Sequence, residues 1–376
     1  MSMKILFVTR KYPPSIGGMQ LLSYYVTTTV AERVPVKLIK WKGAPLWLLP
    51  LFYPYAFFRA LFVILFQPVD LIHIGDPVLA PLGVLLRLIG RVPVAINAHG
   101  LDVVYPNRIY QKIIPACLRK LDLVICISEY TRQQCLVRGV PAERLCLIPV
   151  GVDPRSFVVA LPQDEAATWA HRWAMDLSSG HVLLSVGRLV SRKGVYFFVS
   201  QILPELIKQR TDWIYLIVGD GPDSARIAAA IKDHNLADHV RMLGEVTDEE
   251  RKAVYAMADV FVMPNIPVKG DVEGFGIVTL EARAAGLALV AASLEGVGGD
   301  SLTQEEDILL VPPKDVAAFL KAIDDVLKMD LSHEARLRRR QHVVARYAWT
   351  HIAEGYLAAF HNLCAKFGKN QGCMKR

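Results

Sequence analysis

Two glutamates eight positions apart are the residues whose spacing best suits ligand chemistry. They lie in the segment 271–282, DVEGFGIVTLEA, where a helix is expected to begin at about Gly276. Glu273 would then lie in the preceding loop and Glu281 in the second helical turn, on the order of 12 Å apart if all eight residues were helical. The two carboxylates of a retaining glycoside hydrolase stand about 5 Å apart, so this pair instead predicts contacts with two separate hydroxyl-bearing parts of one ligand. For either glutamate alone, the alternative is an ordinary residue on a helix surface.

A second candidate is a cationic loop at the end of an apolar strand. In the segment 185–194, SVGRLVSRKG, the strand is expected to end at Gly187 and a helix to begin near Gly194. Arg188 and Lys193 are placed to hold a diphosphate, Arg188 through its forked guanidinium and Lys193 as a point charge. The alternative is a solvated run of charges.

The loop after the first strand brings two adjacent glycines to the start of an expected helix. This loop has the sequence RKYPPSIGGM, residues 10–19. Gly17 and Gly18 allow positive φ and a close approach of backbone N–H groups to a ligand, and a helix N-terminus attracts anions. The dinucleotide fingerprint G-x-G-x-x-G is absent, and a simple tight turn is the alternative.

Two histidines occupy strand positions. His99 follows the apolar strand 94–98, at the carboxyl end where open α/β sheets bind their ligands. A hydrogen-bonded structural histidine is the alternative there. His73, inside the apolar run 71–74, is expected to be structural.

These candidates belong to a chain in which short β-branched runs alternate with helical patterns throughout. Such alternation predicts an α/β fold with parallel sheets and crossover helices. A break at 149–154, PVGVDP, separates two similar halves, and we expect domains at 1–160 and 161–347 with the helix 348–365 packed back onto the first domain. Two such sheets facing one another would place their strand ends on either side of a central cleft. The predicted strands are 4–9, 35–40, 70–74, 94–97, 122–127, 145–149, 182–186, 213–218, 239–243, 258–263, 288–292 and 307–311. The predicted helices are 18–33, 52–66, 77–90, 106–120, 129–138, 194–209, 222–234, 248–256, 276–285, 313–328, 331–345 and 348–365.

Charge is unevenly distributed along the 376 residues. Residues 1–160 hold 18 Lys and Arg against 8 Asp and Glu, whereas the remaining residues hold 25 against 28. A basic first half favours an anionic partner such as a membrane surface, a phosphorylated acceptor or nucleic acid, with a solubilising surface bias as the alternative. No nucleic-acid-binding motif supports the last of these partners.

The cysteines and the N-terminus both indicate a cytoplasmic protein. The six cysteines form no C-x-x-C pair and have no histidine at metal-ligand spacing, so reduced thiols and no metal site are expected. The apolar run at the N-terminus, 5–8, is short enough to be a strand and too short for a signal peptide.

The apolar segment 44–66, APLWLLPLFYPYAFFRALFVILF, has the length of a membrane span. Its three prolines and Arg59 argue against a continuous spanning helix. A core helix over 52–66 is one interpretation. A surface helix that docks at the membrane interface through the aromatic stretch 46–62 is another, and a true span is the third.

The ordered set of motifs resembles family-4 glycosyltransferases, retaining enzymes of the GT-B fold, over nearly the whole chain. The motifs are the Gly17-Gly18 loop, His99-Gly100, SEYT at 128–131, IPVGVD at 148–153, VGR at 186–188 with Lys193-Gly194, VGDGP at 218–222, Gly244 and Glu273-x7-Glu281. The resemblance implies two Rossmann-like domains, of which the first binds the acceptor and the second binds the nucleotide sugar.

The same resemblance implies a role for each motif residue. Glu273 would contact the transferred sugar and Glu281 the ribose hydroxyls, while Arg188 and Lys193 would neutralise the departing diphosphate. Gly17 and Gly18 would lie against the phosphates, and His99 would reach the sugar from the first domain. Backbone groups of Phe275, Gly276, Ile277 and Val278 would hold sugar and phosphate, and those of residues 242–245, Gly244 among them, would meet the nucleobase. No metal or other cofactor would be needed, because cations and helix N-termini stabilise the leaving group.

Donor and acceptor are less strongly indicated. The segment 270–278, GDVEGFGIV, is similar to bacterial phosphatidylinositol mannosyltransferases, which favours GDP-mannose over a UDP-hexose. A membrane-associated acceptor, lipid-linked or glycan, agrees with the basic first half and with the segment 46–62, and would place the enzyme at the inner face of the membrane. Departures from the family are Gly75, where relatives often have a second histidine, and the glycine-rich loop 295–300. A nucleotide-sugar epimerase and a catalytically silent glycan- or membrane-binding relative are the alternatives.

Overall fold

The computed structural model describes residues 3–15, 17–41, 46–175, 180–269, 271, 275–294 and 307–373. The chain divides into two compact units, one of Met1–Gly151 with Trp349–Arg376 and one of Val152–Ala348. The Glu273 site and the loop 295–300, both singled out from the sequence, lie outside the described residues.

The first unit is a six-stranded parallel sheet in the order β2-β1-β3-β4-β5-β6. Right-handed crossovers require α1 to leave the sheet on one face and the helices from α2 to α5 to cover the other. The strands are β1 (Ile5–Thr9), β2 (Val36–Lys40), β3 (Leu71–Ile74), β4 (Val94–Ala98), β5 (Leu123–Cys126) and β6 (Leu145–Leu147). The helices are α1 (Gly18–Ala31), α2 (Leu49–Phe66), α3 (Ala80–Gly90), α4 (Leu101–Val104), α5 (Arg108–Leu118), α6 (Glu129–Val137) and α16 (Trp349–Cys373).

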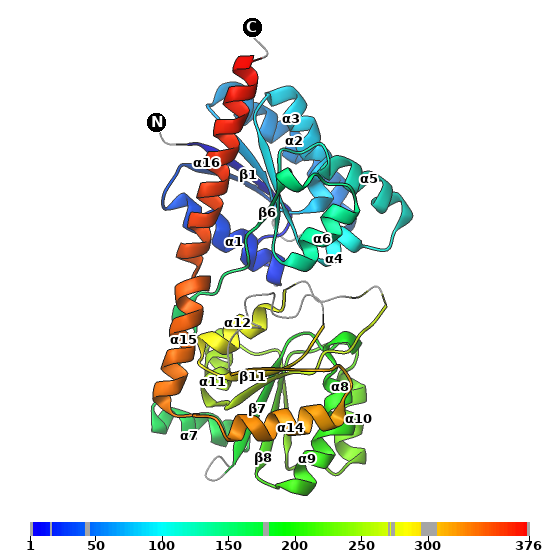
Figure 1. Cartoon of the computed structure of the whole chain (residues 1–376), viewed down its shortest axis with the longest axis vertical. Coiled ribbons are helices and arrows are strands. Elements are labelled where there is room, and N and C mark those ends of the chain that lie inside the picture. Colours follow the sequence, from blue (N-terminus) through cyan, green and yellow to red (C-terminus); the bar gives the residue numbers. More distant parts are fainter. Residues whose placement is uncertain are drawn as a thin grey trace. The chain divides into compact units, whose positions relative to one another are not determined.

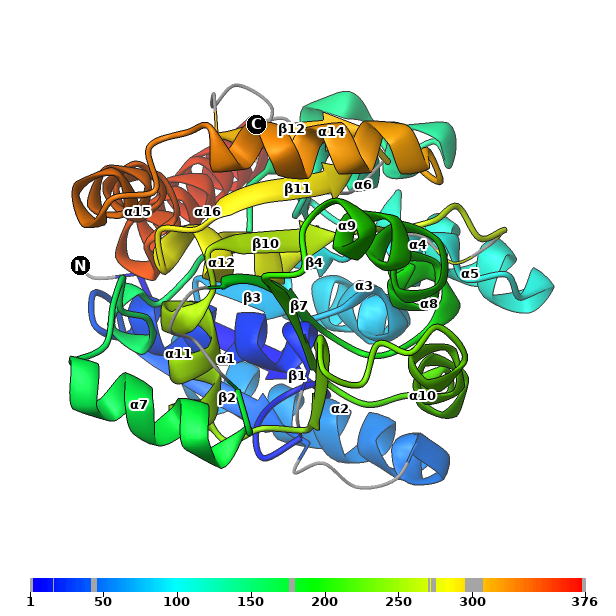
Figure 2. The same cartoon turned by 90° about the horizontal axis from the view of Figure 1, so that it is seen from below.

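The second unit repeats this plan in the order β12-β11-β10-β7-β8-β9. Helix α14 packs along β11 and β12, and Figure 2 shows it beside them. The strands are β7 (His181–Val186), β8 (Trp213–Val218), β9 (Val240–Gly244), β10 (Val260–Met263), β11 (Ala288–Ala292) and β12 (Ile308–Val311). The helices are α7 (Gln163–Arg172), α8 (Val195–Phe197), α9 (Leu203–Gln209), α10 (Ser224–Asp233), α11 (Asp248–Met257), α12 (Ile277–Ala284), α14 (Val316–Leu327) and α15 (His333–Tyr347).

The predicted α/β alternation is confirmed, and the helices differ from the prediction at α2, α4, α7 and the end of α16. Helix α7 has no counterpart among the predicted helices, because its segment carries few apolar residues and only Ala170 of the helix is buried. Helix α2 begins at Leu49, earlier than predicted. Pro50 is tolerated in its first turn, because the N–H group that proline lacks would have no partner within the helix there.

Helix α2 is also not a core helix. It buries one stripe, Phe52, Ala56, Ala60 and Val63, against the first sheet, while most of its remaining surface is apolar and exposed. Helix α2 is long and apolar enough to cross a membrane, and 22% of its 18 residues are buried within this structure. Some core helices of soluble proteins are equally long and apolar.

Helix α16 is the last element of the chain and belongs to the first unit, where it packs against α1 (Figure 1). Trp349 stacks on Tyr25 of α1 with ring centroids 5.0 Å apart. Further along, Tyr356 donates a hydrogen bond to Asn97 Oδ1 of β4 at 3.1 Å, and Phe360 contacts the ring of His73 in β3. The core of the first unit is therefore completed by the two ends of the sequence together.

His73 is structural, as the sequence predicts. Its ring is 1% exposed, lies edge-on to Phe7 at 4.4 Å between centroids, and shares a 3.2 Å hydrogen bond with Asn97 through Nε2. Burial lowers the pKa of His73 to about 3. The side chain is therefore neutral in the folded protein at pH values above about 3.

This neutral histidine predicts a specific acid sensitivity. Because the folded pKa lies below the unfolded value of about 6.5, the contribution of His73 to stability is complete above pH 6.5 and is lost as the pH falls toward 3. The loss approaches about 1.4 kcal/mol per pH unit within that window. We expect His73→Phe to flatten this slope of unfolding free energy, measured by urea titration at several pH values. His351→Asn, at an exposed position of α16, serves as the control; an unchanged slope in His73→Phe would contradict the assignment.

Candidate functional site

In the second unit, the polar residues gather where the strand order reverses. Strand β7 continues to β8 on one side, whereas β10 on its other side continues away toward β11. The helices after β7 and β10 therefore leave on opposite faces, which opens a crevice at the carboxyl ends of these strands. A pocket occupies this position, with Ser185, Gly187 and Lys193 on the β7 side and Met263, Pro264 and Asn265 on the β10 side.

Glycines allow the backbone segments around this pocket to approach closely. A Cβ on Gly219 would lie 2.1 Å from the carbonyl oxygen of Gly187, and one on Gly194 would lie 1.8 Å from that of Pro264. Gly187 has φ 144° and Gly219 has φ 120°, backbone angles that residues other than glycine rarely adopt. The loop after β7 is thus fixed by direct backbone contact with the loops after β8 and β10.

Lys193 and Arg188, the predicted diphosphate clamp, differ in their surroundings. The Lys193 side chain is half-buried and lines the pocket. It lies against Gly187, since a Cβ built on Gly187 would lie 3.5 Å from Lys193 Cε. Arg188 is exposed. A third cation of the loop, Arg192, forms a 2.9 Å ion pair with Asp271.

Glu281 has partners that sequence reasoning did not identify. Its side chain lies on α12 and is 8% exposed; Oε2 accepts a 2.8 Å hydrogen bond from the hydroxyl of Tyr255, and Oε1 lies 3.6 Å from Nη1 of Arg251. Burial, followed by the charge of Glu281, raises the pKa of Tyr255 well above its ordinary value. The Tyr255 hydroxyl therefore keeps its proton and fixes the glutamate, while a carboxylate still has lone pairs for a ligand.

The remaining predicted donor-site residues lie at the starts and ends of the same elements. Gly276, at φ 72°, is the N-cap of α12, and no side chain among the described residues caps this helix start. Ile277 and Val278 lie in its first turn, where backbone N–H groups have no partner within the helix. Phe275 is buried beside it. Gly244 ends β9 with φ 67°, and its carbonyl accepts a 2.7 Å hydrogen bond from Gly219 N.

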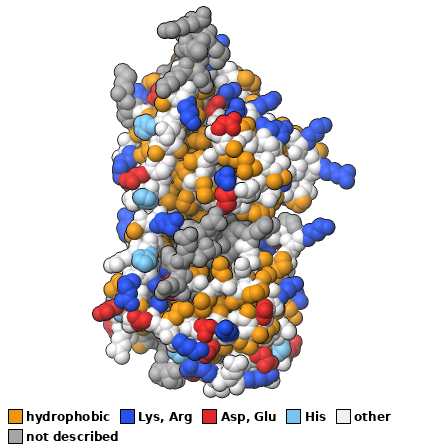
Figure 3. Space-filling view, viewed as in Figure 1, with side chains coloured by type: hydrophobic (Ala, Val, Ile, Leu, Met, Phe, Trp, Pro, Cys, Tyr) orange, Lys and Arg blue, Asp and Glu red, His pale blue; other side chains and the backbone are white. Residues whose placement is uncertain are grey.

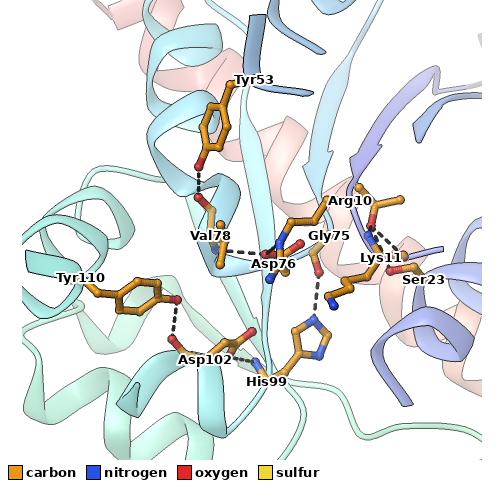
Figure 4. Close-up of polar contacts among 11 residues, drawn as sticks. Arg10, Lys11, Ser23, Tyr53, Gly75, Asp76, Val78, His99, Asp102 and Tyr110 are labelled. Atoms are coloured by element: carbon orange, nitrogen blue, oxygen red, sulfur yellow. Dashed lines mark hydrogen bonds and ion pairs between the residues drawn. The ribbon is translucent and has the colours of Figure 1, made fainter. Parts of the chain in front are cut away.

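The first unit has its own reversal of strand order, between β1 and β3. Arg10 follows β1 and Asp76 follows β3, and the two side chains meet at 2.9 Å between Nε and Oδ1 (Figure 4). The Asp76 side chain is fully buried and also accepts a 3.1 Å hydrogen bond from Val78 N. Sequence reasoning could not identify this pair, because no local pattern relates two residues 66 positions apart.

His99 lies in the same cluster with a defined tautomer. Its Nε2 lies 2.9 Å from the carbonyl oxygen of Gly75, which can only accept, so Nε2 carries the proton and Nδ1 is left as an acceptor. Burial lowers the pKa of His99, which favours the neutral ring. Gly75 itself lies close to β1, because a Cβ there would lie 2.5 Å from Thr9 Oγ1. Close packing against β1 thus explains why a glycine occupies the position where relatives often have a second histidine.

Asp102 and the glycine loop complete the first cluster. Asp102 Oδ1 accepts a 2.9 Å hydrogen bond from His99 N, and the Tyr110 hydroxyl donates to the Asp102 carbonyl at 2.6 Å (Figure 4). Gly17, at φ 147°, is the N-cap of α1 and Gly18 its first residue. The described candidate residues therefore fall into two sets, one at the carboxyl ends of the strands of each sheet, and their assigned roles remain predictions.

Within the described part of the chain, no three His, Cys, Asp or Glu side chains come together as a metal site would require. The cations of the second unit are the groups there that could hold an anion.

Comparison with known proteins places both units. Residues 8–156 match the model described as Glycosyltransferase Family 4, and residues 180–329 match Glycosyl transferases group 1. The chain is 30% identical to a GDP-mannose-dependent alpha-(1-6)-phosphatidylinositol monomannoside mannosyltransferase of Mycobacterium tuberculosis, over 93% of this chain and 96% of the relative. Identity to the protein of the same description from Mycolicibacterium smegmatis is 31%, over 86% and 89%. Among solved structures, Anabaena Alr3699/HepE in complex with UDP matches with a TM-score of 0.74 at 18% identity, over 96% of this chain and all of that one.

The backbone contacts around the second pocket can be tested by one substitution. Gly219→Ala would push a methyl group into the Gly187 carbonyl, and neither backbone can give way without moving the Lys193 loop. We expect a loss of at least about 3 kcal/mol in unfolding free energy, since steric overlap adds to about 1–3 kcal/mol of backbone strain. Gly139→Ala is the matched control: φ is 78° there, but the added Cβ would make only ordinary contacts. Equal losses in the two variants would refute the close approach.

Proposed function

Because the chain belongs to the family-4 glycosyltransferases, we propose that it transfers a hexose from a nucleotide-diphosphate sugar to a membrane-associated acceptor with retention of configuration. The observation that carries this proposal is the pocket at the reversal point of the second sheet, lined by Lys193 and closed by glycine backbones. A cation at the carboxyl ends of parallel strands suits a diphosphate.

We further propose GDP-mannose as the donor. The relatives from M. tuberculosis and M. smegmatis are described as GDP-mannose-dependent. The segment 270–278, which resembles such enzymes, supports the same sugar. A UDP-hexose is the competing donor.

In the proposed mechanism, the protein stabilises the charges that develop when the anomeric C–O bond breaks. The sugar becomes cationic and the diphosphate gains negative charge, which Lys193, Arg188 and the uncapped start of α12 would neutralise. Glu273 would orient the sugar, Glu281 the ribose, and His99 would accept a hydrogen bond from a sugar hydroxyl at Nδ1. The acceptor hydroxyl would attack the anomeric carbon on the face from which the diphosphate leaves and give its proton to the departing phosphate oxygen, with no covalent protein intermediate and no metal.

Nucleotide binding is the first test of this proposal. We expect GDP and GDP-mannose to raise the thermal unfolding midpoint more than UDP, ADP or UDP-glucose, because a ligand of the native state stabilises it by mass action. The shift should be equal with and without EDTA. Lys193→Ala should reduce it, and Lys208→Ala, on the exposed face of α9, should not. A folded wild-type protein with no shift for any nucleotide would overturn the proposal, and a larger shift with UDP would replace the donor.

The membrane part of the proposal rests on the surface of the first unit formed by α2, α3 and α5. Helix α2 exposes an apolar stripe at helical spacing, and its neighbour α3 adds to it, as does α5. These three helices contain no Asp or Glu, and they carry Arg59, Arg87, Arg108 and Lys112. Figure 3 shows Lys and Arg side chains (blue) projecting from the side of this unit where Figure 1 places α5. The exposed apolar residues are Trp47, Leu51, Tyr55, Phe58, Phe62, Leu65, Phe66, Leu85, Leu88, Ile89, Ile109 and Ile113.

This apolar and basic face, residues 47–66 with α3 and α5, suits insertion into the interface of an anionic bilayer. A spanning orientation of α2 would instead strip its buried stripe, Phe52 to Val63, from the sheet. We therefore propose that the enzyme lies peripherally on the cytoplasmic side of the membrane, where a lipid-linked acceptor would reach it.

Membrane docking predicts a loss of vesicle binding when the α2 stripe becomes polar. In the triple variant Phe58→Ser, Phe62→Ser and Leu65→Ser, three exposed apolar side chains disappear, each worth about 1.5–3 kcal/mol when buried. Sedimentation with phosphatidylglycerol vesicles should show binding at least about a hundredfold weaker. Val137→Ser, 79% exposed on α6 of the same unit, is the control. Undiminished binding of the triple variant would exclude this face.

A further inference from the structure

Two aspartates of the first unit each keep one carboxylate oxygen without a partner. Asp76 Oδ2 and Asp102 Oδ2 are both buried, and neither accepts a hydrogen bond from any residue that the structure describes. Leaving a buried acceptor unsatisfied costs about 1–3 kcal/mol, more when it is charged. These two atoms, one after β3 and one after β4, are therefore places where hydroxyl or N–H groups of a ligand could bind.

Asp76 is held so that only this one oxygen is available. Its Oδ1 is occupied by Arg10 Nε and Val78 N, and the side chain is 0% exposed. Tyr53 of α2 donates to the Val78 carbonyl, which fixes the turn that carries the aspartate (Figure 4). The free oxygen therefore has a defined position and cannot rotate away to water.

Asp102 is fixed just as firmly and lies within electrostatic range of Asp76. Its Oδ1 caps His99 N, and its own carbonyl is held by Tyr110. Burial, followed by the charge of Asp76, raises the pKa of Asp102 well above its ordinary value. The Asp102 carboxyl thus keeps a proton to higher pH than other aspartates, and can donate as well as accept.

The neighbouring groups define the chemistry of the ligand. Arg10 and the half-buried Lys11 are cations on the same side, and the Lys11 pKa is lowered by burial and then by Arg10. These cations disfavour a cationic ligand, and the two aspartates disfavour a simple anion. His99 Nδ1 adds a further acceptor. Hydroxyl groups, which both donate and accept, match this mixture of fixed acceptors and donors.

We propose that Asp76 and Asp102 bind hydroxyl groups of a sugar or cyclitol unit of the acceptor. This inference rests on the proposed function, since it assigns the acceptor side of the same reaction. Both residues are binding residues for a polyol ring, and they determine which ring the enzyme accepts.

A matched control is built into the same sheet. Asp122 pairs with Arg87 at 2.8 Å and accepts a 3.0 Å hydrogen bond from Val94 N, the same types of partner that Asp76 has. It precedes β5, at the amino ends of the strands. Asp122→Asn therefore removes an equivalent charge and ion pair without touching the carboxyl edge.

The test is saturation-transfer NMR of the full chain in the presence of GDP, with myo-inositol and methyl α-D-mannopyranoside as probes. At least one probe should give transfer signals with the wild-type protein and with Asp122→Asn. Asp102→Asn and Asp76→Asn should reduce that signal at least about tenfold, because the amide nitrogen that replaces Oδ2 cannot accept a hydrogen bond from a hydroxyl group. Asp102→Asn leaves the Arg10 pair intact, so it remains informative if Asp76→Asn unfolds.

Two results would overturn the inference. One is the absence of transfer to both probes in a wild-type protein that binds GDP; the other is an equal signal in Asp102→Asn and Asp122→Asn. The proposed function would fail on a different observation, the lack of any nucleotide binding by the folded protein. The same samples therefore distinguish failure of this inference from failure of the proposed function.

Discussion

In both sheets, the first strand lies between one neighbour that directly follows it and another that comes later in the chain. This reversal of strand order forces the helices after β1 and β3, and those after β7 and β10, to leave on opposite faces. The backbone at these two points has no crossover helix above it and is open for side chains. Arg10 and Asp76 meet at the first reversal point, and Lys193 and Asn265 line the second. The positions of these four residues depend on this one constraint.

Close backbone packing then determines which side chains can use these positions. Gly75 lies against Thr9, and its carbonyl fixes the protonated nitrogen of His99. Gly219 lies against the Gly187 carbonyl in the second unit and fixes the loop that carries Lys193. In each unit, a glycine on one strand end thus sets the orientation of a polar group on another. Such sites are rigid before a ligand arrives, which limits the ordering cost of binding.

The sequence predicts the parts of this arrangement that depend on local pattern. The alternation of strands and helices, the glycine-flanked loops and the structural role of His73 follow from residue types at short spacing. Helix α7 was not predicted, because its segment carries few apolar residues and only Ala170 of the helix is buried. The Arg10–Asp76 pair and the Tyr255–Glu281 hydrogen bond were inaccessible for a related reason, since each joins elements that only the sheet topology brings together. For Glu281, the predicted ligand contact and the observed structural contact occupy the same carboxylate.

The two Arg–Asp pairs of the first sheet differ in whether their hydrogen bonding is complete. At Asp122 the side chain is 12% exposed and Arg87 33%, so water can complete the hydrogen bonding of both groups. At Asp76 the side chain is fully buried, and Oδ2 has no donor within the described residues. A buried ion pair contributes little net stability even when fully satisfied, and an incompletely satisfied one is a cost to the unliganded fold. The rest of the first unit, from the buried sheet to the packing of α16 on α1, must offset that cost. A polyhydroxylated ligand bound at the reversal point would remove part of that cost by supplying the missing donors.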